Sequence, residues 1–170
     1  DIIDFKDLAV KGALMKLAID TTGDGEISYG EAAAYTGNFN FRDNLNIYSF
    51  KELQYFTSVT AIGSSAFSGC ENLLEIILPN SIKSISYSAF QNCKSLYSIT
   101  IPSKVTQLEA SIFNGCTSLA SINMLPATPP TINEQYAYTF NGVPSTAVIK
   151  VPCRNMDAYL TDSIWNATVT

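Results

Sequence analysis

Oxygen-bearing residues recur at alternate positions in the twelve residues from Asp20 to Glu31. The segment has an acid at its first position, a glycine at its sixth, where a sharp turn is needed, and an acid at its twelfth. Calcium takes about six to eight hard oxygen ligands in a flexible shell, and this spacing supplies them. The spacing predicts a calcium site made by Asp20, Thr22, Asp24, the backbone carbonyl of Glu26, Ser28 and the bidentate carboxylate of Glu31.

The loop has the spacing of an EF-hand, with Ile27 expected to point into the core, but an explanation without metal is also open. Ser28-Tyr-Gly-Glu31 is a capping box as well, and Asp-Gly turns are common in loops that bind nothing. Thr22 replaces the more usual Asp or Asn, and only one such loop is present although EF-hands usually work in pairs. We predict a weak, structural calcium site, with a dissociation constant of about 10⁻⁴–10⁻³ M, and keep the metal-free helical turn as the alternative.

Helices are expected on both sides of this loop. An amphipathic helix is predicted over about residues 4–19, with Asp4 as its N-cap. A shorter helix is predicted over about Tyr29–Thr36, with Gly37 as its C-terminal stop. We assign residues 1–44 to this EF-hand-like helical cap, which lacks a second EF-hand to pack on and is expected to cover the open end of the repeats.

The chain repeats itself every 23 residues between Val59 and Pro126. Each unit has a short strand, a turn of the pattern x-x-Ala-Phe-x-x-Cys and a second strand of the pattern Leu-x-x-Ile-x-Leu-Pro. A period in the twenties is typical of a leucine-rich-repeat solenoid, so we predict an α+β fold in which residues 45–170 form the solenoid and its C-terminal cap. The clearest columns are Phe67, Phe90 and Phe113; Cys70, Cys93 and Cys116; Leu73, Leu96 and Leu119; and Ile76, Ile99 and Ile122.

The three repeat cysteines occupy equivalent positions on successive coils, about 4.8 Å apart. That spacing would just permit a disulfide, but cysteine packs well as a small buried hydrophobe. A zinc ion would need four ligands at one level, which three coils do not provide. We therefore predict a ladder of buried free thiols.

The repeat motif resembles the BspA-like class of leucine-rich repeat. The pattern Ile-x-x-x-Ala-Phe-x-x-Cys-x-x-Leu-x-x-Ile-x-Leu-Pro stands at Ile62–Pro79 and again, with Ile101 for the last leucine, at Ile85–Pro102, and the third unit departs from it with Ile112 and Met124. The resemblance implies a secreted or cell-surface protein of bacteria, of a class usually described as adhesins for host matrix proteins or other bacterial surfaces. A targeting segment is expected to be absent from this chain.

The last part of the chain is expected to close the solenoid. Ala147–Pro152 repeats the strand-then-proline pattern and predicts a final strand. An amphipathic helix is predicted over about Asn155–Trp165, with an apolar face made by Met156, Tyr159, Leu160 and Ile164. Trp165 is expected to seal the last coil. Cys153 lies outside the repeat columns, and we expect it to pack in this cap, with a reactive free thiol as the alternative.

Composition argues against most enzymes and against nucleic-acid binding. The chain has no histidine, which removes Ser-His and Cys-His catalysis, and its net charge is −5, whereas nucleic acids select basic surfaces. A polysaccharide hydrolase would need two carboxylates about 5–9 Å apart, and no such pair stands out. No apolar run is long enough to cross a membrane, so we predict no membrane insertion. We also predict that the protein is not an enzyme and that it is a monomer.

The outward-facing positions of the second strands form the predicted ligand surface. Its columns are small, mixed and almost uncharged, which suits contact with a protein or a carbohydrate at a host or bacterial surface. An ordinary solvated sheet explains the same residues, so the alternative is a structural or spacer domain with no ligand of its own. The predicted surface residues are Glu75, Ile77, Tyr97, Ser98, Thr100, Ser121 and Asn123.

Overall fold

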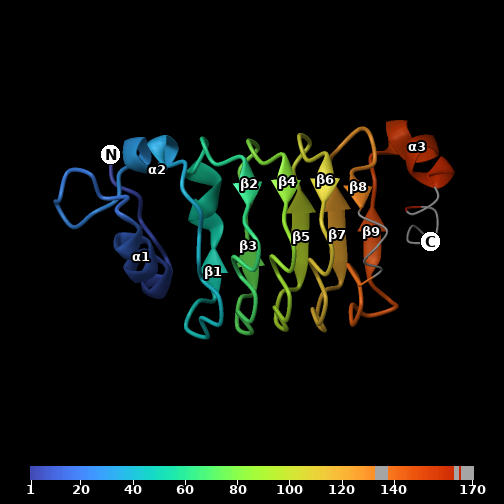
Figure 1. The fold of residues 1–170 in the computed structure, drawn as a ribbon, viewed down its shortest axis with the longest axis horizontal. Helices are drawn as coiled ribbons and strands as arrows, with labels where there is room; N and C mark the ends of the chain where they lie inside the picture. The colour runs from blue at the N-terminus through green and yellow to red at the C-terminus, as the bar shows by residue number, and fades with distance from the viewer. Residues whose placement is uncertain (133–137, 163–164, 166–170) are drawn as a thin grey trace.

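Short parallel strands stack along one axis between two helical ends (Figure 1). The computed structural model describes residues 1–132, 138–162 and 165. The helices are α1 (Leu8–Leu14), α2 (Tyr29–Ala34) and α3 (Met156–Thr161), with 3-10 turns at Met15–Leu17, Lys51–Tyr55 and Cys153–Asn155. The strands are β1 (Ser49–Phe50), β2 (Ala61–Ile62), β3 (Glu75–Ile76), β4 (Ser84–Ile85), β5 (Ser98–Ile101), β6 (Gln107–Leu108), β7 (Ser121–Met124), β8 (Thr131–Ile132) and β9 (Val148–Lys150).

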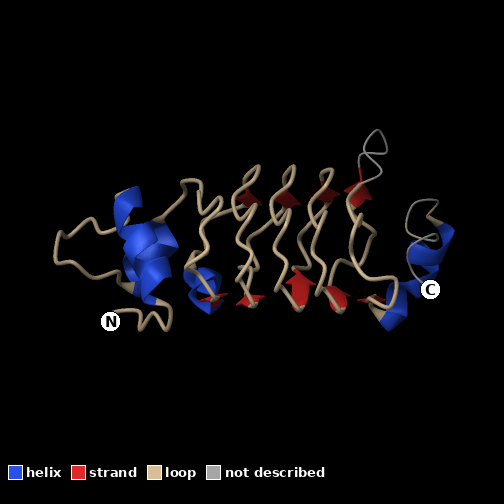
Figure 2. Cartoon of the chain, turned by 90° about the horizontal axis from the view of Figure 1, so that it is seen from below, coloured by secondary structure: helices blue, strands red, loops and turns tan. Residues whose placement is uncertain are grey.

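Each coil contributes one strand to each of two opposite walls (Figure 2). One wall is the parallel sheet β2-β4-β6-β8, and the other contains the parallel pair β1-β3 and the parallel sheet β5-β7-β9. Ile62 pairs with Ile85 and Ile85 with Leu108, so the 23-residue step of the sequence is also the pairing register. The predicted α+β solenoid of 23-residue coils with short helical ends is confirmed.

The turns between the walls are tied together by a third ladder of backbone hydrogen bonds. Phe67 N donates to Ala89 O at 2.8 Å, and Phe90 N donates to Ile112 O at 3.0 Å. Inside these turns the phenylalanine rings of neighbouring coils stack with centroids 5.3–6.1 Å apart. The stack runs through Phe41, Phe67, Phe90, Phe113 and Phe140, so the first coil already includes a turn ahead of residue 45.

The repeat cysteines form the predicted ladder of buried free thiols. Each Sγ donates a hydrogen bond to a phenylalanine carbonyl of the preceding coil, as Cys93 does to Phe67 O at 3.1 Å. Burial raises the pKa of the Cys70 and Cys116 thiols to about 12. These thiols therefore serve as core packing with a satisfied donor. Cys153 differs from them: it is exposed, so the expectation that it packs in the cap is wrong.

A second column of turn residues adopts positive φ values and shows why glycine alternates with polar residues. Gly69 and Gly115 have φ values of 74° and 78°, and Asp43 and Asn92 have values of 55° and 58°. A Cβ atom at Gly69 would overlap Oδ1 of Asp43, and one at Gly115 would overlap Oδ1 of Asn92. The polar side chain of one coil thus occupies the space that the glycine of the next coil leaves open.

Each end of the solenoid has backbone groups with no neighbouring coil to pair with, and the caps satisfy several of them. At the N-terminal end the carboxylate of Asp7 accepts hydrogen bonds from Tyr48 N at 2.6 Å and Ser49 N at 3.1 Å. At the C-terminal end Tyr159 Oη donates to Pro126 O and Trp165 Nε1 donates to Pro130 O, both at 2.9 Å. The predicted seal at Trp165 is confirmed.

The helices are shorter than the apolar spacing predicts. Asp7, not Asp4, is the N-cap of α1, because its Oδ1 accepts from Ala9 N at 3.0 Å while Asp4 pairs with exposed Lys6. Helix α2 ends at Ala34 because Tyr35 is already extended. None of the helices that the structure describes is long and apolar enough to cross a lipid bilayer.

The C-terminal helix is held mainly by one aromatic residue. Tyr159 of α3 is fully buried and meets Trp165 edge-on at 5.5 Å between ring centroids. Met156 and Leu160, which the apolar spacing assigned to the same buried face, are exposed. Ile164, the last predicted contact of this helix, lies outside the described residues.

Candidate functional site

The predicted calcium loop closes on itself through its own acids. Asp20 accepts from Gly23 N at 2.6 Å on one oxygen and from Gly25 N at 2.9 Å on the other. Gly25 has a φ of 82°, which side-chain-bearing residues rarely adopt, so the glycine is required for this turn. Hydrogen bonds from these backbone groups, led by that from Gly25, lower the pKa of Asp20.

Glu31 joins the two ends of the loop. One of its oxygens accepts from Thr21 N at 2.8 Å and Thr22 N at 3.1 Å, and the other accepts from Ser28 N at 2.9 Å and Ser28 Oγ at 2.8 Å. Ser28 Oγ in turn accepts from Glu31 N, which completes the capping box. These bonds, first of all those from Ser28, lower the pKa of Glu31 to about 2.

The loop is also anchored to the rest of the cap. Lys11 Nζ of α1 lies 2.6 Å from Glu26 Oε2, and Ile27 is fully buried, as its position predicts. The N-terminal segment pairs with the loop through an antiparallel bridge between Ile2 and Ser28, and Ile3 N donates to Ile27 O at 2.9 Å. A single loop is therefore stabilised without a second EF-hand beside it.

The loop contains the capping box that the sequence also predicts. Across the described residues, no group of three or more His, Cys, Asp or Glu side chains is placed so that it could hold one ion. Asp20, Asp24 and Glu31 have the right oxygen chemistry for calcium, but their carboxylates are engaged by loop donors. Calcium binding by this loop stays a prediction.

The predicted ligand surface lies on the wall formed by β3, β5 and β7. Ser98 pairs with Ser121 and Thr100 with Asn123, so these two columns are continuous from coil to coil. Along β5 the outward residues alternate with buried Ile99 and Ile101. The structure thus brings the predicted residues onto one face, and Glu75, Ile77 and Tyr97 extend that face on β3 and at the start of β5.

An exposed row of large apolar side chains crosses this face and joins it to helix α1. We call it the apolar stripe; its members are Leu8, Tyr48, Leu74 and Tyr97, which are 75%, 52%, 53% and 65% exposed. Leu74 N donates to Tyr48 O at 2.8 Å and Tyr97 N donates to Leu74 O at 3.5 Å, so three members are neighbours on successive coils. Of these four residues, only Tyr97 belongs to the predicted ligand surface, although Leu74 was expected to face solvent.

The missed residues had only weak signals in the sequence. Leu74 shares its repeat column with Tyr97, so its exposure was predictable, but Tyr48 stands outside the 23-residue step. Leu8 comes from the cap and fitted a buried helical face. It is exposed because α1 begins only at Leu8, with Asp7 beside β1.

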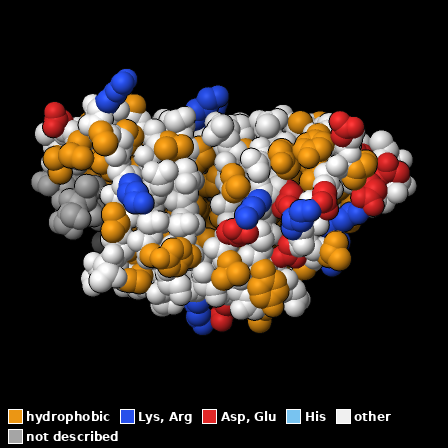
Figure 3. Space-filling view, turned by 180° about the vertical axis from the view of Figure 1, so that it is seen from behind, with side chains coloured by type: hydrophobic (Ala, Val, Ile, Leu, Met, Phe, Trp, Pro, Cys, Tyr) orange, Lys and Arg blue, Asp and Glu red, His pale blue; other side chains and the backbone are white. Residues whose placement is uncertain are grey.

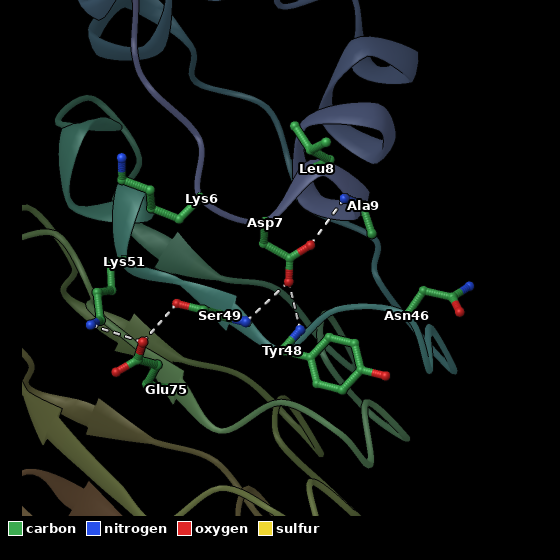
Figure 4. Close-up of a pocket in the computed structure, with 9 residues that line it drawn as sticks. All are labelled: Lys6, Asp7, Leu8, Ala9, Asn46, Tyr48, Ser49, Lys51 and Glu75. Carbon is green, nitrogen blue, oxygen red and sulfur yellow. Dashed lines mark hydrogen bonds and ion pairs between the residues drawn. The ribbon is translucent and has the colours of Figure 1, made fainter.

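A groove of about 460 Å³ lies where α1 meets the first coil (Figure 4). Leu8 and Tyr48 border it, and Asp7 lies between them with its carboxylate on the backbone of β1. Across the groove Lys51 Nζ lies 2.8 Å from Glu75 Oε1, and Lys51 lowers the pKa of Glu75. In the space-filling view charged side chains gather over the N-terminal end of the molecule, whereas apolar side chains are spread along the coils (Figure 3).

The coils, the stacked turns and the two capped ends define a leucine-rich-repeat solenoid protein. A family model described as the BspA type leucine rich repeat region matches residues 36–161, in six copies. The chain therefore belongs to the BspA-type leucine-rich-repeat family.

Solved structures of bacterial leucine-rich-repeat proteins are similar to this chain. One from T. pallidum is 26% identical over 65% of this chain and 55% of its own, with a TM-score of 0.48. A leucine-rich cell surface protein from Faecalibacterium prausnitzii is 24% identical over 68% and 32%, with a TM-score of 0.47, and one from Bacteroides ovatus is 25% identical over 62% and 36%, with a TM-score of 0.40. The chain thus spans about half or less of these proteins. The search of curated proteins gave no match.

Proposed function

We propose that this chain is a non-enzymatic binding module of a secreted or cell-surface bacterial protein and adheres to a host matrix protein or glycan. The wall that carries β1, β3, β5, β7 and β9 is the proposed binding face. The proposal is supported by the family to which the chain belongs, and the observation that carries it is the apolar stripe on that wall.

The stripe is unusual because its members are large, adjacent and exposed. Contiguous apolar surface on a soluble protein commonly marks an interaction site, and tyrosine is enriched among the residues that contribute most to binding. Burying a side chain of the size of Leu74 against a partner contributes about 1.5–3 kcal/mol. The stripe thus offers a larger gain on binding than the hydroxyl and amide columns beside it.

Hydrolysis of a glycan has little support on this face. Glu75 is tied to Lys51 at 2.8 Å and to Ser49 Oγ at 3.0 Å, and Glu71 is tied to Lys94 at 2.7 Å. A carboxylate that acts as general acid needs a raised pKa, whereas the pKa of Glu75 is lowered. The chemistry of the face favours binding without turnover.

The test is a binding array of host matrix proteins and glycans, probed with the wild type and two matched variants. Thr100→Lys changes the proposed face, and Thr106→Lys changes an exposed threonine beside β6, on the opposite wall. A saturable signal that Thr100→Lys abolishes and Thr106→Lys retains supports the proposal. A signal that both variants retain contradicts the proposed face, and no signal from any probe favours the spacer role.

We also propose that the loop from Asp20 to Glu31 binds calcium weakly and structurally. The support is the ligand spacing, since three carboxylates and Gly25 occupy the positions that such a site needs. At a tenfold excess over its dissociation constant, calcium would add about 1.4 kcal/mol, or roughly 3–6 °C in melting temperature. Melts in calcium, magnesium and EDTA, repeated with Asp20→Asn, test this; a wild-type melt that is the same in all three contradicts it.

A further inference from the structure

We propose that Asn141 is a site of spontaneous deamidation, and that the fold protects Asn114, which stands in the same tripeptide. Asparagine precedes glycine only twice in the chain, and both times phenylalanine comes before it, in Phe113-Asn114-Gly115 and in Phe140-Asn141-Gly142. Both tripeptides lie in turns between the two walls, away from the strands of the proposed binding face. Because their local chemistry is the same, a difference between their rates is set by the structure.

The reaction uses only groups of the chain and water. The backbone nitrogen of the glycine attacks Cγ of the preceding asparagine and loses its proton, the side-chain nitrogen leaves as ammonia, and a cyclic succinimide forms. Water then opens the ring at either carbonyl, which leaves aspartate or isoaspartate and adds one negative charge. A glycine favours the attack because it has no Cβ atom to hinder it. Its nitrogen must also be free to give up its proton and to turn towards Cγ.

Both glycines belong to the column of turn residues with positive φ values, whose N–H groups form a ladder of their own. Each N–H donates to a carbonyl of the next coil: Asp43 N to Ser68 O, Gly69 N to Gln91 O and Asn92 N to Asn114 O, all at 2.7 Å. Gly115 N continues this ladder with a bond to Asn141 O at 2.8 Å. The proton that reaction at Asn114 must remove is therefore held by the next coil.

The ladder ends at Gly142, in the last coil that the structure describes (Figure 1). Gly142 has a φ of 80° and packs on Gly115, because a Cβ atom built on it would lie 3.2 Å from both Cα and N of Gly115. Its own N–H has no hydrogen-bond acceptor within residues 1–132, 138–162 and 165. Asn141 and Gly142 are exposed, whereas Asn114 and Gly115 are half-buried. The attacking nitrogen is thus engaged at Asn114 and accessible at Asn141.

One backbone hydrogen bond separates the two sites, and this gives the size of the expected difference. A hydrogen bond of ordinary net strength corresponds to a factor of about ten in an equilibrium constant. Gly115 must also leave a ladder whose neighbouring coils hold it on both sides. In the folded protein Asn141 should therefore react at least about tenfold faster than Asn114.

The product changes the end of the solenoid. In isoaspartate the main chain runs through the former side-chain carbonyl, which inserts a methylene group and displaces the carbonyl that accepts from Gly115 N. The same turn places Phe140 on Phe113 at the end of the ring stack. Deamidation at Asn141 thus loosens the last turn and adds a carboxylate there.

The experiment follows both asparagines in the intact chain by mass spectrometry. Folded protein is kept in mildly alkaline buffer, and samples are digested and fragmented so that the amide-to-acid mass change is assigned to Asn114 or to Asn141. Enzymatic methylation of isoaspartate shows that the product came through the succinimide. Incubation in guanidinium chloride is the matched control, because the two identical tripeptides should react at similar rates once the chain is unfolded.

Two variants assign the fast reaction. Asn141→Gln keeps an amide whose ring closure is much slower, so it should remove the fast reaction, whereas Asn114→Gln should leave it unchanged. Circular dichroism melts check that both variants fold, and if Asn141→Gln does not, the comparison of the two sites within the wild type decides.

Equal rates at the two sites of the folded protein, or a faster reaction at Asn114, would overturn the proposal. So would an Asn141 that reacts in guanidinium chloride and stays intact in the folded protein. A ratio of the two rates that is the same in both conditions also contradicts it, since the fold would then protect neither site.

Discussion

Asp7 is the residue on which the junction between the cap and the first coil depends. Its Oδ1 accepts from Ala9 N at 3.0 Å and Val10 N at 3.4 Å, which caps α1. Its Oδ2 accepts from Tyr48 N and Ser49 N, which belong to the first coil. One carboxylate thus holds a helix and an edge strand together, and it lies in the groove between α1 and the first coil.

Two substitutions separate these roles. Asp7→Ser keeps a hydroxyl that can cap α1 but is too short to reach β1, so it should cost the two strand bonds. Because one of the two lies at an exposed edge where water can replace it, we expect a loss of about 1 kcal/mol. Asp7→Ala also removes the cap, for about 2 kcal/mol in all. For a chain of this length these losses lower the melting temperature by roughly 2–4 °C and 4–8 °C.

Asp4→Ala is the control, because Asp4 is 80% exposed on its side chain and pairs with exposed Lys6. It should change the melting temperature little. Amide hydrogen exchange gives a residue-level readout: Asp7→Ser should speed exchange at Tyr48 and Ser49 while Ala9 stays protected. An Asp4→Ala variant as unstable as Asp7→Ala, or unchanged exchange at Tyr48, would refute the assignment.

Three further predictions concern the loop, the thiols and the turns. The pKa of Glu31 is lowered from 4.5 to about 2, so its contribution to the free energy of unfolding is complete above pH 4.5 and is lost towards pH 2. The difference in free energy of unfolding between wild type and Glu31→Gln, measured by urea melts, should therefore shrink as the pH falls from 4.5 to 2. A difference that stays constant contradicts this prediction. A thiol reagent at pH 8 should modify Cys153 at once and the three buried thiols only on unfolding, so a Cys153→Ser variant should show no fast phase. Gly115→Ala should lower the free energy of unfolding by about 1–2 kcal/mol because it puts a side chain at a positive φ, and by a further amount because the new Cβ displaces Asn92. In an Asn92→Gly background only the loss due to the positive φ should remain.

The repeats were predictable because the contacts within a solenoid give its sequence a regular spacing. Each coil touches only its neighbours, so residues that stack in space recur at a fixed step in the chain. Phe67, Phe90 and Phe113 are at once a sequence column and a ring stack. Where the step changes, the signal is lost: Phe41 and Phe140 continue the same stack, but the periodicity does not reach them.

The caps were predictable in kind but not in detail. Apolar spacing indicates a helix near the N-terminus, for which Asp4 was the predicted N-cap, whereas the structure has Asp7 in that position. The choice is made by the backbone of β1, which lies more than 40 residues away and needs an acceptor for its outward N–H groups. The calcium loop is ambiguous for a related reason, because the same residues serve as metal ligands or as a capping box.

From the sequence alone follow the 23-residue coil, the inward and outward alternation of the strands and the free-thiol ladder, because each depends on neighbours at a constant separation. Only the tertiary structure assembles the apolar stripe. Leu8 belongs to the cap, Tyr48 to an irregular first coil, and Leu74 and Tyr97 to the regular repeats, so no single periodicity contains all four. They share a surface because Asp7 holds α1 against β1, and a contact between segments so far apart leaves no period in the chain.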